Sequence, residues 1–469
     1  MTNPASPSIS RTVAAHPVPF ETARRVVPIG DPGAFLRSME GAPRGFWARG
    51  PRWVAHGGIL GEVAPGGGVE RYRAARDAGR AWRAMGDGQE ALRFYGGFSF
   101  REDHCPEGRW QAFPATLFHL PAVEFDGEGA GPARLRVRVP HDGDVARARA
   151  DAEAGADRLV EALSEPGGRL PPLAPGGPAP ARVREGDRVR WMEAVEETLA
   201  AIRAGGISKA VLARTRDVEV ARPIPPVEVL LSLWGQHTRT HAFLFEPRPG
   251  AILLGAAPEA LATLRDGTVT ATAVAGSVRR GGDSREDELL ARELLESRKD
   301  LAEHRAVVED MVTRLSALTE PVSAQPEPHI LTLARIQHLE TEIEAPAPAG
   351  MSVLDLVEAL HPTPAVCGVP RDAALEFLLG VEPFQRGWYA GPVGWFDGDG
   401  EGHFVPALRT TVGDGCHWRL FAGAGIVEGS RPSLEWEETG IKLLPVLRAL
   451  ADSGAALADL DLAPSGEGA

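Results

Sequence analysis

Strand-like and helix-like segments are grouped along this chain, and that grouping constrains its fold more than any other feature. In the first half, segments such as LRFYGGFSF, ATLFHLPAVEF and ARLRVRVP follow one another with turn residues between them. Consecutive strands favour antiparallel pairing, whereas strict alternation with helices would predict a doubly wound parallel sheet. We therefore predict an α+β fold with largely antiparallel sheets.

A long segment dense in proline and glycine divides the chain in two. This segment, SEPGGRLPPLAPGGPAPARVREGD at residues 164–187, is predicted to be a surface connection. Residues 1–24 and 452–469 have the composition of flexible tails. The division leaves an N-terminal lobe at residues 25–163 and a second region at residues 188–451.

The second region begins with a predicted helix, WMEAVEETLAAIRAG, followed by a strand, SKAVLARTRDVEV. A long amphipathic helix is predicted over residues 284–318, where leucine, valine and methionine recur near helical spacing. Strands are predicted around GPVGWFD, HFVPALRTTV and HWRLFAGAGIV. A final helix follows, for which Ser433 is the expected N-cap.

Composition excludes several classes of protein. The chain has a net charge of -14 and no basic block, which argues against binding to nucleic acid or anionic membranes. No run of 18 apolar residues is present, and the N-terminus lacks the order of a secretory signal, so we expect a cytoplasmic protein. Cys105, Cys367 and Cys416 are widely spaced without a CxxC pair, which supports neither a disulfide framework nor a zinc site.

Lysine is unusually rare in this chain. Lysine and arginine total 50, yet Lys209, Lys299 and Lys442 are the only lysines. Lysine presents a compact charge and, unlike arginine, can lose its proton near neutral pH, so a retained lysine can have a chemical role. The alternative is that these three lysines were retained by chance.

The motifs of P-loop, dinucleotide-binding, zinc-peptidase and serine-hydrolase sites are absent, which leaves carboxylate and lysine chemistry.

Two predicted helices each carry a pair of carboxylates three residues apart. Asp300 and Glu303 form one pair, and Glu435 and Glu438 form the other, with Lys442 one turn further on. This spacing places both members of a pair on one helical face. Together the two helices could hold Mg²⁺, which takes one or two direct carboxylates and keeps water ligands. Two solvated acidic faces would show the same spacing.

Lys209 and Glu259 are candidates for proton transfer. Lys209 lies in a mostly apolar strand, where a cation is costly, and is a candidate general base. Glu259 follows a strand-like run and a proline, and an apolar setting would make it the matching acid. The alternatives are that Lys209 is only a cation on an edge strand and that Glu259 is only a carboxylate in a loop, with no chemical role. Two small-residue loops, AGS and AGAGIV, could let backbone N–H groups approach a substrate carboxylate.

Seven motifs join these residues into one pattern. In order along residues 190–450 they are SKAVLAR, GAAPEAL, AGSVRRG, KDLAEH, HPTPAVCG, RLFAGAGIV and EWEETGIKL. Their order and spacing resemble the chorismate-utilising, anthranilate synthase component I-like enzymes, and most closely the isochorismate synthases. The resemblance implies a two-lobed chorismate-binding fold, with sheets packed face to face and helices outside, and an isomerase that acts with Mg²⁺.

The resemblance also implies a role for each candidate residue. Lys209 is similar to the base that activates water for attack at C2 of chorismate, and Glu259 to the acid that protonates the departing C4 hydroxyl. Glu303 and Glu438 match direct Mg²⁺ ligands, and Asp300 and Glu435 match carboxylates that reach the metal through water. Substrate contacts are implied for Gly276, Ser277, Ala365, Arg409, Gly423 and Lys442.

Other reactions catalysed within this family are the alternatives to isochorismate formation. Salicylate synthases share the positions of Lys209 and Glu259 and go on to eliminate pyruvate, whereas the HPTPA motif resembles enzymes that stop at isochorismate. Ala275 stands where some aminating relatives carry a nucleophilic lysine, and Cys367 and Ala257 stand where serine is usual. A non-catalytic chorismate-binding protein and a glutamine-dependent aminating subunit are the alternatives of other classes. The resemblance further implies a monomer without an obligatory glutaminase partner, in menaquinone or siderophore biosynthesis.

Overall fold

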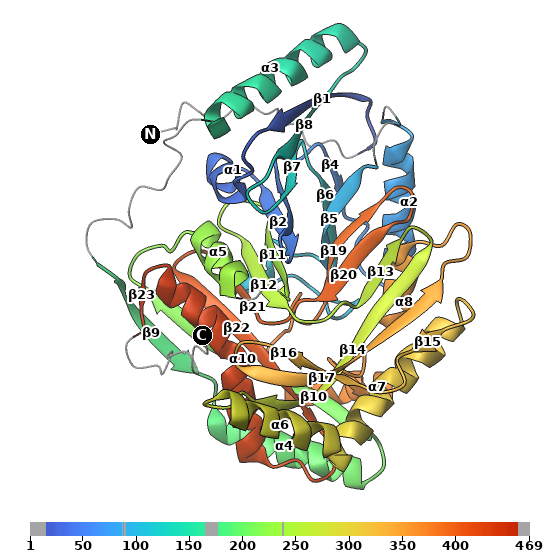
Figure 1. Cartoon of the computed structure of the whole chain (residues 1–469), viewed down its shortest axis with the longest axis vertical. Coiled ribbons are helices and arrows are strands. Elements are labelled where there is room, and N and C mark those ends of the chain that lie inside the picture. The colour runs from blue at the N-terminus through green and yellow to red at the C-terminus, as the bar shows by residue number, and fades with distance from the viewer. Residues whose placement is uncertain (1–15, 87, 89–90, 165–176, 237–238, 458–469) are drawn as a thin grey trace.

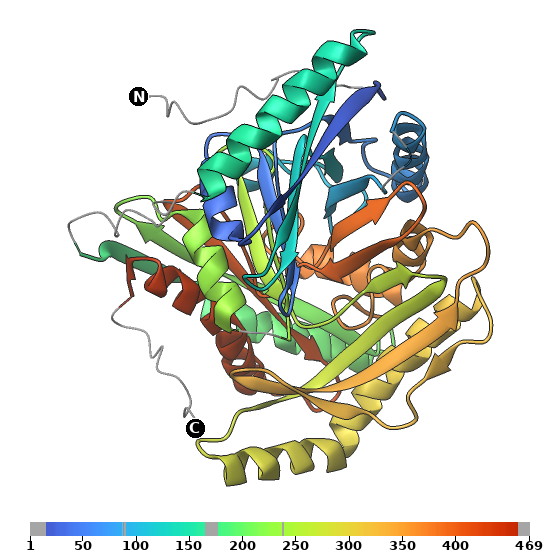
Figure 2. The same ribbon diagram turned by 45° about the horizontal axis from the view of Figure 1, so that its top comes forward.

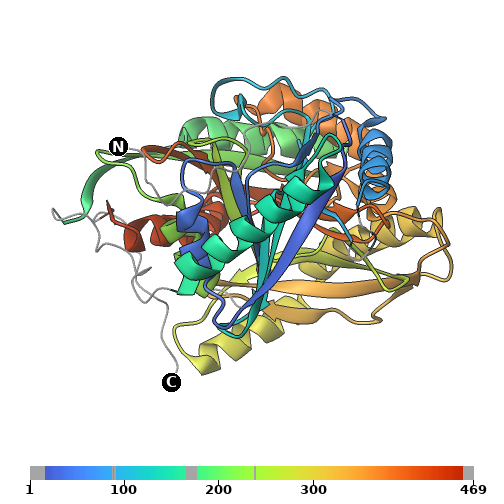
Figure 3. The same ribbon diagram turned by 90° about the horizontal axis from the view of Figure 1, so that it is seen from above.

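The computed structural model describes residues 16–86, 88, 91–164, 177–236 and 239–457. Within these residues, one sheet of 13 strands and one of 10 strands form the centre of the molecule, and helices cover their outer faces (Figures 1 and 3). Every strand pair is antiparallel except that between the last two strands of the larger sheet. The predicted α+β class with largely antiparallel sheets is confirmed.

The larger sheet runs from one end of the molecule to the other. Its strands, in spatial order, are β1 (Phe20–Val27), β8 (Ala133–Pro140), β7 (Val123–Glu128), β3 (Arg52–Gly57), β2 (Arg44–Arg49), β11 (His241–Glu246), β12 (Ile252–Ala257), β21 (Thr410–Gly413), β22 (His417–Ile426), β10 (Lys209–Val220), β9 (Ala179–Glu185) and β23 (Ala455–Ala456). The short strand β18 (Gly368–Val369) pairs with the start of β10.

The smaller sheet faces the larger one. Its order is β15 (Ser323–Ala324), β17 (Ile336–Pro346), β14 (Thr268–Arg279), β13 (Ala262–Arg265), β20 (Gly402–Pro406), β19 (Pro392–Asp397), β5 (Arg93–Phe98), β6 (Thr116–Leu120) and β4 (Gly61–Val63), with β16 (His329–Thr332) also on β17.

The helices are α1 (Pro32–Ser38), α2 (Arg71–Arg83), α3 (Val145–Ser164), α4 (Arg188–Arg203), α5 (Pro226–Gln236), α6 (Ser284–Glu296), α7 (Arg298–Ser316), α8 (Val353–Leu360), α9 (Arg371–Val381) and α10 (Pro432–Asp452), and η1 (Gly108–Trp110) is a 3₁₀ turn.

Buried apolar side chains fill the space between the sheets. Leu212 and Phe243 from the larger sheet and Leu117 and Val393 from the smaller one belong to a single core cluster. Two further clusters hold the helices on the outside, one beneath α3, α5 and α10 and one beneath α2, α7 and α8. The packing of the two sheets face to face is therefore as the resemblance implied.

The predicted domain boundaries need correction at three places. β1 begins at Phe20, inside the segment predicted to be a tail, and pairs with β8 along its whole length. β9 lies inside the predicted connection, and β23 lies inside the predicted C-terminal tail. In each place the pairing partner is remote in sequence, so local composition gave no sign of it. Residues 1–15, 165–176 and 458–469 of these segments lie outside the described residues.

The two halves of the chain also share both sheets. β2 of the first half pairs with β11 of the second, and β5 pairs with β19. Figure 2 shows α3 lying across β1 and β8 at one end of this shared framework. The Pro/Gly-rich segment thus divides the sequence without dividing the sheets.

Two helix boundaries differ from prediction. The amphipathic stretch over residues 284–318 is two helices, because Ser297 has an extended backbone and caps α7 through the N–H of Asp300. In α10 the N-cap is Arg431, and Pro432 occupies the first turn, so Ser433 already lies inside the helix. Among the residues that the structure describes, no helix is both long and apolar enough to cross a membrane.

Candidate active site

A cavity of about 300 Å³ lies between the two sheets, beside α7 and α10. All twelve residues singled out from the sequence line it, although they come from eight separate stretches of the chain. They are Lys209, Glu259, Gly276, Ser277, Asp300, Glu303, Ala365, Arg409, Gly423, Glu435, Glu438 and Lys442. The cavity brings together every residue to which the resemblance assigned a role.

Lys209 is the first residue of β10, and its ammonium group is almost completely buried. The Nζ atom lies 2.8 Å from Oε1 of Glu303 on α7, and the two side chains are 5% and 12% exposed. Burial raises the pKa of Glu303, but the charge and the hydrogen bond of Lys209 lower it further, so its pKa lies below its usual range. In this structure, Lys209 and Glu303 therefore form an ion pair.

Gly425 on β22 leaves the space that this ion pair occupies. A Cβ atom at Gly425 would lie 2.8 Å from Oε1 of Glu303 and 3.0 Å from Cε of Lys209. Both are far ends of flexible side chains, so they would move aside without disturbing the backbone. We expect Gly425→Ala to lower kcat by about 100-fold, since a misplacement of about 1 Å has that cost, and to leave the melting temperature nearly unchanged.

Steady-state kinetics and thermal unfolding of Gly425→Ala would test this expectation. Gly380→Ala is the matched control, because a Cβ atom at this position on α9 meets nothing within 4 Å. Gly380→Ala should keep wild-type kcat. Equal kcat values for the two variants would show that the cavity tolerates displacement of Lys209 and Glu303.

α10 presents a second carboxylate and lysine one turn apart. Lys442 Nζ lies 2.5 Å from Oε1 of Glu438 and 3.0 Å from the carbonyl of Gly423 on β22. Glu435 lies one turn before Glu438, and burial together with the charge of Glu438 raises the pKa of Glu435 to about 7. Positive charge placed between these two carboxylates would relieve their repulsion.

α7 contributes Asp300 in its first turn. The hydroxyl of Ser297 donates to Asp300, and the N–H of Asp300 donates in turn to Ser297 at 3.3 Å. Burial raises the pKa of Asp300, and the neighbouring Glu303 adds to this effect. The cap therefore fixes Asp300 at the helix terminus, one turn from Glu303 and beside the cavity.

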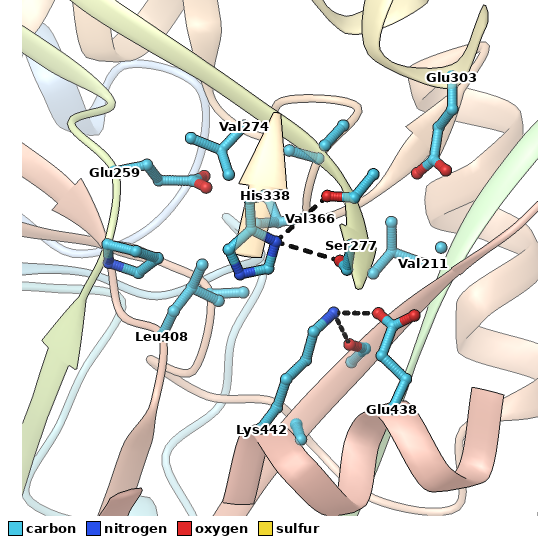
Figure 4. Close-up of a pocket in the computed structure, with 18 of the residues that line it drawn as sticks. Val211, Glu259, Val274, Ser277, Glu303, His338, Val366, Leu408, Glu438 and Lys442 are labelled. Carbon is cyan, nitrogen blue, oxygen red and sulfur yellow. Dashed lines mark hydrogen bonds and ion pairs between the residues drawn. The ribbon is translucent and has the colours of Figure 1, made fainter. Parts of the chain in front are cut away.

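The four carboxylates could bind a hard cation as a loose set. Within the described part of the chain, no three Asp, Glu, His or Cys side chains are grouped closely enough to hold a metal ion by themselves. The carboxylates of Glu303 and Glu438 nevertheless point into the same space from α7 and α10 (Figure 4). Oxygen donors of this kind, with one or two direct contacts, fit Mg²⁺, which keeps most of its water.

Glu259 faces the cavity from the side opposite Glu303 and Glu438 (Figure 4). It follows β12 and Pro258, and it is 6% exposed. Burial raises its pKa to about 8, although the positive charges of Arg409, Lys442 and Lys209 oppose the shift. Glu259 is therefore mostly protonated at neutral pH and can donate a proton, whereas Lys209 lies on the side of Glu303.

His338 on β17 is a cavity residue that the sequence analysis missed. Arg409 Nη2 lies 3.2 Å from His338 Nε2, and a guanidinium group can only donate, so this nitrogen accepts. Nδ1 then carries the proton and faces Ser277 Oγ at 3.1 Å and the Gly276 carbonyl at 3.3 Å. Burial and the charge of Arg409 hold the pKa of His338 well below its usual range, so the ring is neutral. His338 thus fixes Arg409 toward the substrate space.

A β-bulge shapes this part of the wall. The register of β14 on β17 shifts between Ala275 and Ser277, where Gly276 has φ +76°. Such a conformation favours glycine, and a Cβ atom at Gly276 would lie 3.2 Å from Cβ of Asp300. The glycine therefore allows both the bulge and the close approach of α7.

Lys299 and Tyr389 also line the cavity and were not among the candidates. Lys299 is exposed at the N-terminal end of α7. All three lysines of the chain therefore face one cavity. Tyr389 is buried and stacked on Phe421, and a Cβ atom at Gly423 would lie 3.0 Å from its hydroxyl. The rarity of lysine was a signal that could have identified Lys299.

Three further residues lie away from the cavity wall, and two of them, Cys367 and Ala257, were discussed from the sequence. The thiol of Cys367 is buried against the carbonyl of Arg371, and Ala257 is buried at the end of β12. His304 is buried as well, and its Nε2 lies 2.7 Å from Thr341 Oγ1. Neither Cys367 nor Ala257 lines the cavity, although each is next to a residue that does.

Comparison with known proteins identifies a family for this chain. The family model described as "Chorismate binding enzyme" matches residues 70–451. The salicylate biosynthesis isochorismate synthase of Pseudomonas aeruginosa is 38% identical over 377 residues, which cover 79% of this chain and 77% of the relative. The isochorismate synthase MenF of Bacillus subtilis is 35% identical over 359 residues, covering 76% and 74%.

A solved structure shares the architecture. The menaquinone-specific isochorismate synthase MenF of Escherichia coli superposes with a TM-score of 0.77 at 27% identity. The match covers 94% of this chain and 96% of the other. The similarity therefore extends over both sheets, including the half of the sequence whose motifs were least distinctive.

Proposed function

Because the chain belongs to the family of chorismate-binding enzymes, we propose that it is an isochorismate synthase. The observation that carries this proposal is a single cavity lined by a buried lysine, a protonated glutamic acid on the opposite side and two pairs of carboxylates. The names of the relatives at 35–38% identity support the same activity.

In the proposed reaction, one water molecule adds to chorismate and one leaves. Lys209 acts in its neutral amine form, released from its ion pair with Glu303, and accepts a proton from water as the water oxygen forms a bond to C2 of the ring. The ring double bonds shift, and the bond between C4 and its hydroxyl breaks. Glu259 gives its proton to the departing hydroxyl, so that water leaves and isochorismate remains. Glu259 lies across the cavity from Glu303, which is the partner of Lys209, and this arrangement supports the division of roles.

Arg409 and Lys442 are suited to bind the two carboxylates of the substrate. Both are partly buried cations that face the cavity, and His338 and Gly423 hold their polar groups in place. The small side chains of Gly276 and Ala365 leave room for the ring. Because water is the nucleophile in this proposal, the protein needs no glutaminase partner to supply ammonia.

We propose that Mg²⁺ is the cofactor, held directly by Glu303 and Glu438 and through water by Asp300 and Glu435. When bound, the ion would supply positive charge for a substrate carboxylate and compete with Lys209 and Lys442 for Glu303 and Glu438. Treatment with EDTA should therefore abolish turnover, and addition of Mg²⁺ should restore it. Calorimetric titration of Mg²⁺ into the metal-free protein and into Glu303→Gln would measure the binding itself. Full activity in EDTA would contradict this prediction.

Product analysis tests the proposed function. Purified protein is incubated with chorismate and Mg²⁺, and the products are separated by chromatography and identified by mass. Isochorismate as the only product supports the proposal. Salicylate with pyruvate would instead identify a salicylate synthase, and an aminated product that forms only with ammonium salts would identify an aminating enzyme. Binding of chorismate without turnover would identify a non-catalytic protein.

A further inference from the structure

Strand β10, which begins at Lys209, is interrupted on one of its edges. One edge pairs continuously with β22 from Ala210 to Glu219. On the other edge, pairing with β18 ends at Ala210, and pairing with β9 resumes only at Arg216. Buried backbone groups between these points need other hydrogen-bond partners.

The N–H of Val211 donates to the carbonyl of Cys367 at 2.7 Å, and two side chains supply partners for other groups on this edge. Arg386 Nη2 donates to the carbonyl of Val211 at 2.6 Å, and the N–H of Ala213 donates to Glu382 Oε1 at 2.8 Å. Arg386 and Glu382 are themselves joined by two hydrogen bonds, of 2.5 and 2.8 Å. Their side chains are 4% and 7% exposed. The ion pair thus replaces a strand along this stretch of β10.

The same guanidinium group also holds the neighbouring loop, which reaches β10 through Cys367. Arg386 Nη1 donates to the carbonyl of Val366 at 2.8 Å, and the ring of Phe100 packs 4.4 Å from its Cζ atom. Val366 follows Ala365, and Val211 lies two residues after Lys209. Both valines line the cavity (Figure 4), whereas Arg386 and Glu382 do not. One buried group therefore connects the strand of Lys209 with the loop of Ala365.

We infer that Glu382 and Arg386 are positioning residues that set the spacing between Lys209 and the loop at Ala365 and Val366, an inference that rests on the proposed function. Stability is a weak reason for such a pair, because apolar residues often replace a buried ion pair without loss. The planar fork of arginine can reach three acceptors in fixed directions, which a lysine ammonium group cannot.

The test removes the pair together with its charges. The double variant Glu382→Leu with Arg386→Met leaves no unpaired charge, but three buried backbone groups lose a partner, so we expect it to fold with a melting temperature below that of the wild type. We expect kcat for isochorismate formation to fall by about 100-fold. Arg386→Lys, which keeps the charge but not the fork, should show a similar loss.

The chain offers a matched control. Arg44 and Glu246 form another buried pair at 2.6 Å in the larger sheet, 5% and 6% exposed, which also bonds a backbone carbonyl and a backbone N–H. Glu246→Leu with Arg44→Met should keep wild-type kcat. Equal kcat values for the two double variants would overturn the positioning role.

Hydrogen exchange provides a readout that does not depend on the reaction. We expect faster exchange of the amides at residues 208–215 and 363–367 in Glu382→Leu with Arg386→Met, but not in the control. Unchanged exchange would overturn the inference. If the wild-type protein made no isochorismate, the proposed function would fail, and the exchange measurement would still decide whether the pair orders these two segments.

Discussion

Replacement of Lys209 by glutamine is expected to lower kcat for isochorismate formation by about 10³-fold, within the range that loss of a general base produces. The glutamine amide can still donate a hydrogen bond to Glu303, which otherwise would lose its partner at 2.8 Å. The KM for chorismate should change much less, because Lys209 is proposed to act on water and not on the substrate carboxylates.

The control for Lys209→Gln lies on the same strand. Arg216 is a buried cation of β10 that pairs with Glu185, far from the cavity. Arg216→Gln removes a positive charge from the strand without removing the proposed base, so kcat should stay within a few-fold of the wild type. If Lys209→Gln kept more than about a tenth of wild-type kcat, Lys209 would not be the base.

Glu259→Gln is expected to lower kcat by about 10²–10⁴-fold, because glutamine cannot protonate the leaving hydroxyl. The pH dependence provides a second readout. Burial raises the pKa of Glu259 to about 8, so the acid is protonated below this pH and becomes ionised above it. Wild-type activity should therefore fall about tenfold for each pH unit above about pH 8, and Glu259→Gln should lose this dependence.

Asp397 provides the matched control for Glu259. Burial also raises its pKa, to about 6, but it lies at the end of β19 and does not line the cavity. Asp397→Asn keeps an oxygen that can accept from the N–H groups of Asp399 and Glu401. It should retain both the rate and the alkaline decline of the wild type. An unchanged alkaline decline in Glu259→Gln would rule out Glu259 as the group that titrates.

The fold class could be predicted because grouped strands favour antiparallel pairing, which is a local signal. Features that depend on remote partners could not. β1 pairs with β8, more than a hundred residues away, and β9 pairs with β10 and β23. Neither segment has a composition that distinguishes it from an irregular terminus or linker. The break at Ser297 was missed because apolar spacing continues across it, although the residue itself is a preferred N-cap.

The candidate site was predictable to the extent that its residues lie in recognisable motifs. His338 lies in no such motif, and only the pairing of β17 with β14 brings it to Ser277 and Arg409. Glu382 and Arg386 are four residues apart, which resembles an ordinary surface ion pair on a helix. α9 ends at Val381, however, and the pair is buried behind the cavity. Sequence spacing alone does not distinguish these two environments.

We propose that this chain adds solvent water to C2 of chorismate, and isotopic labelling tests this proposal most directly. The reaction is run with Mg²⁺ in water enriched in ¹⁸O, and the product is analysed by mass at early times, before the reverse reaction exchanges further oxygen. We predict isochorismate that is two mass units heavier, with the label on the C2 hydroxyl. Isochorismate that carries no label would mean that the hydroxyl moves within the substrate, and it would contradict the roles proposed for Lys209 and Glu259.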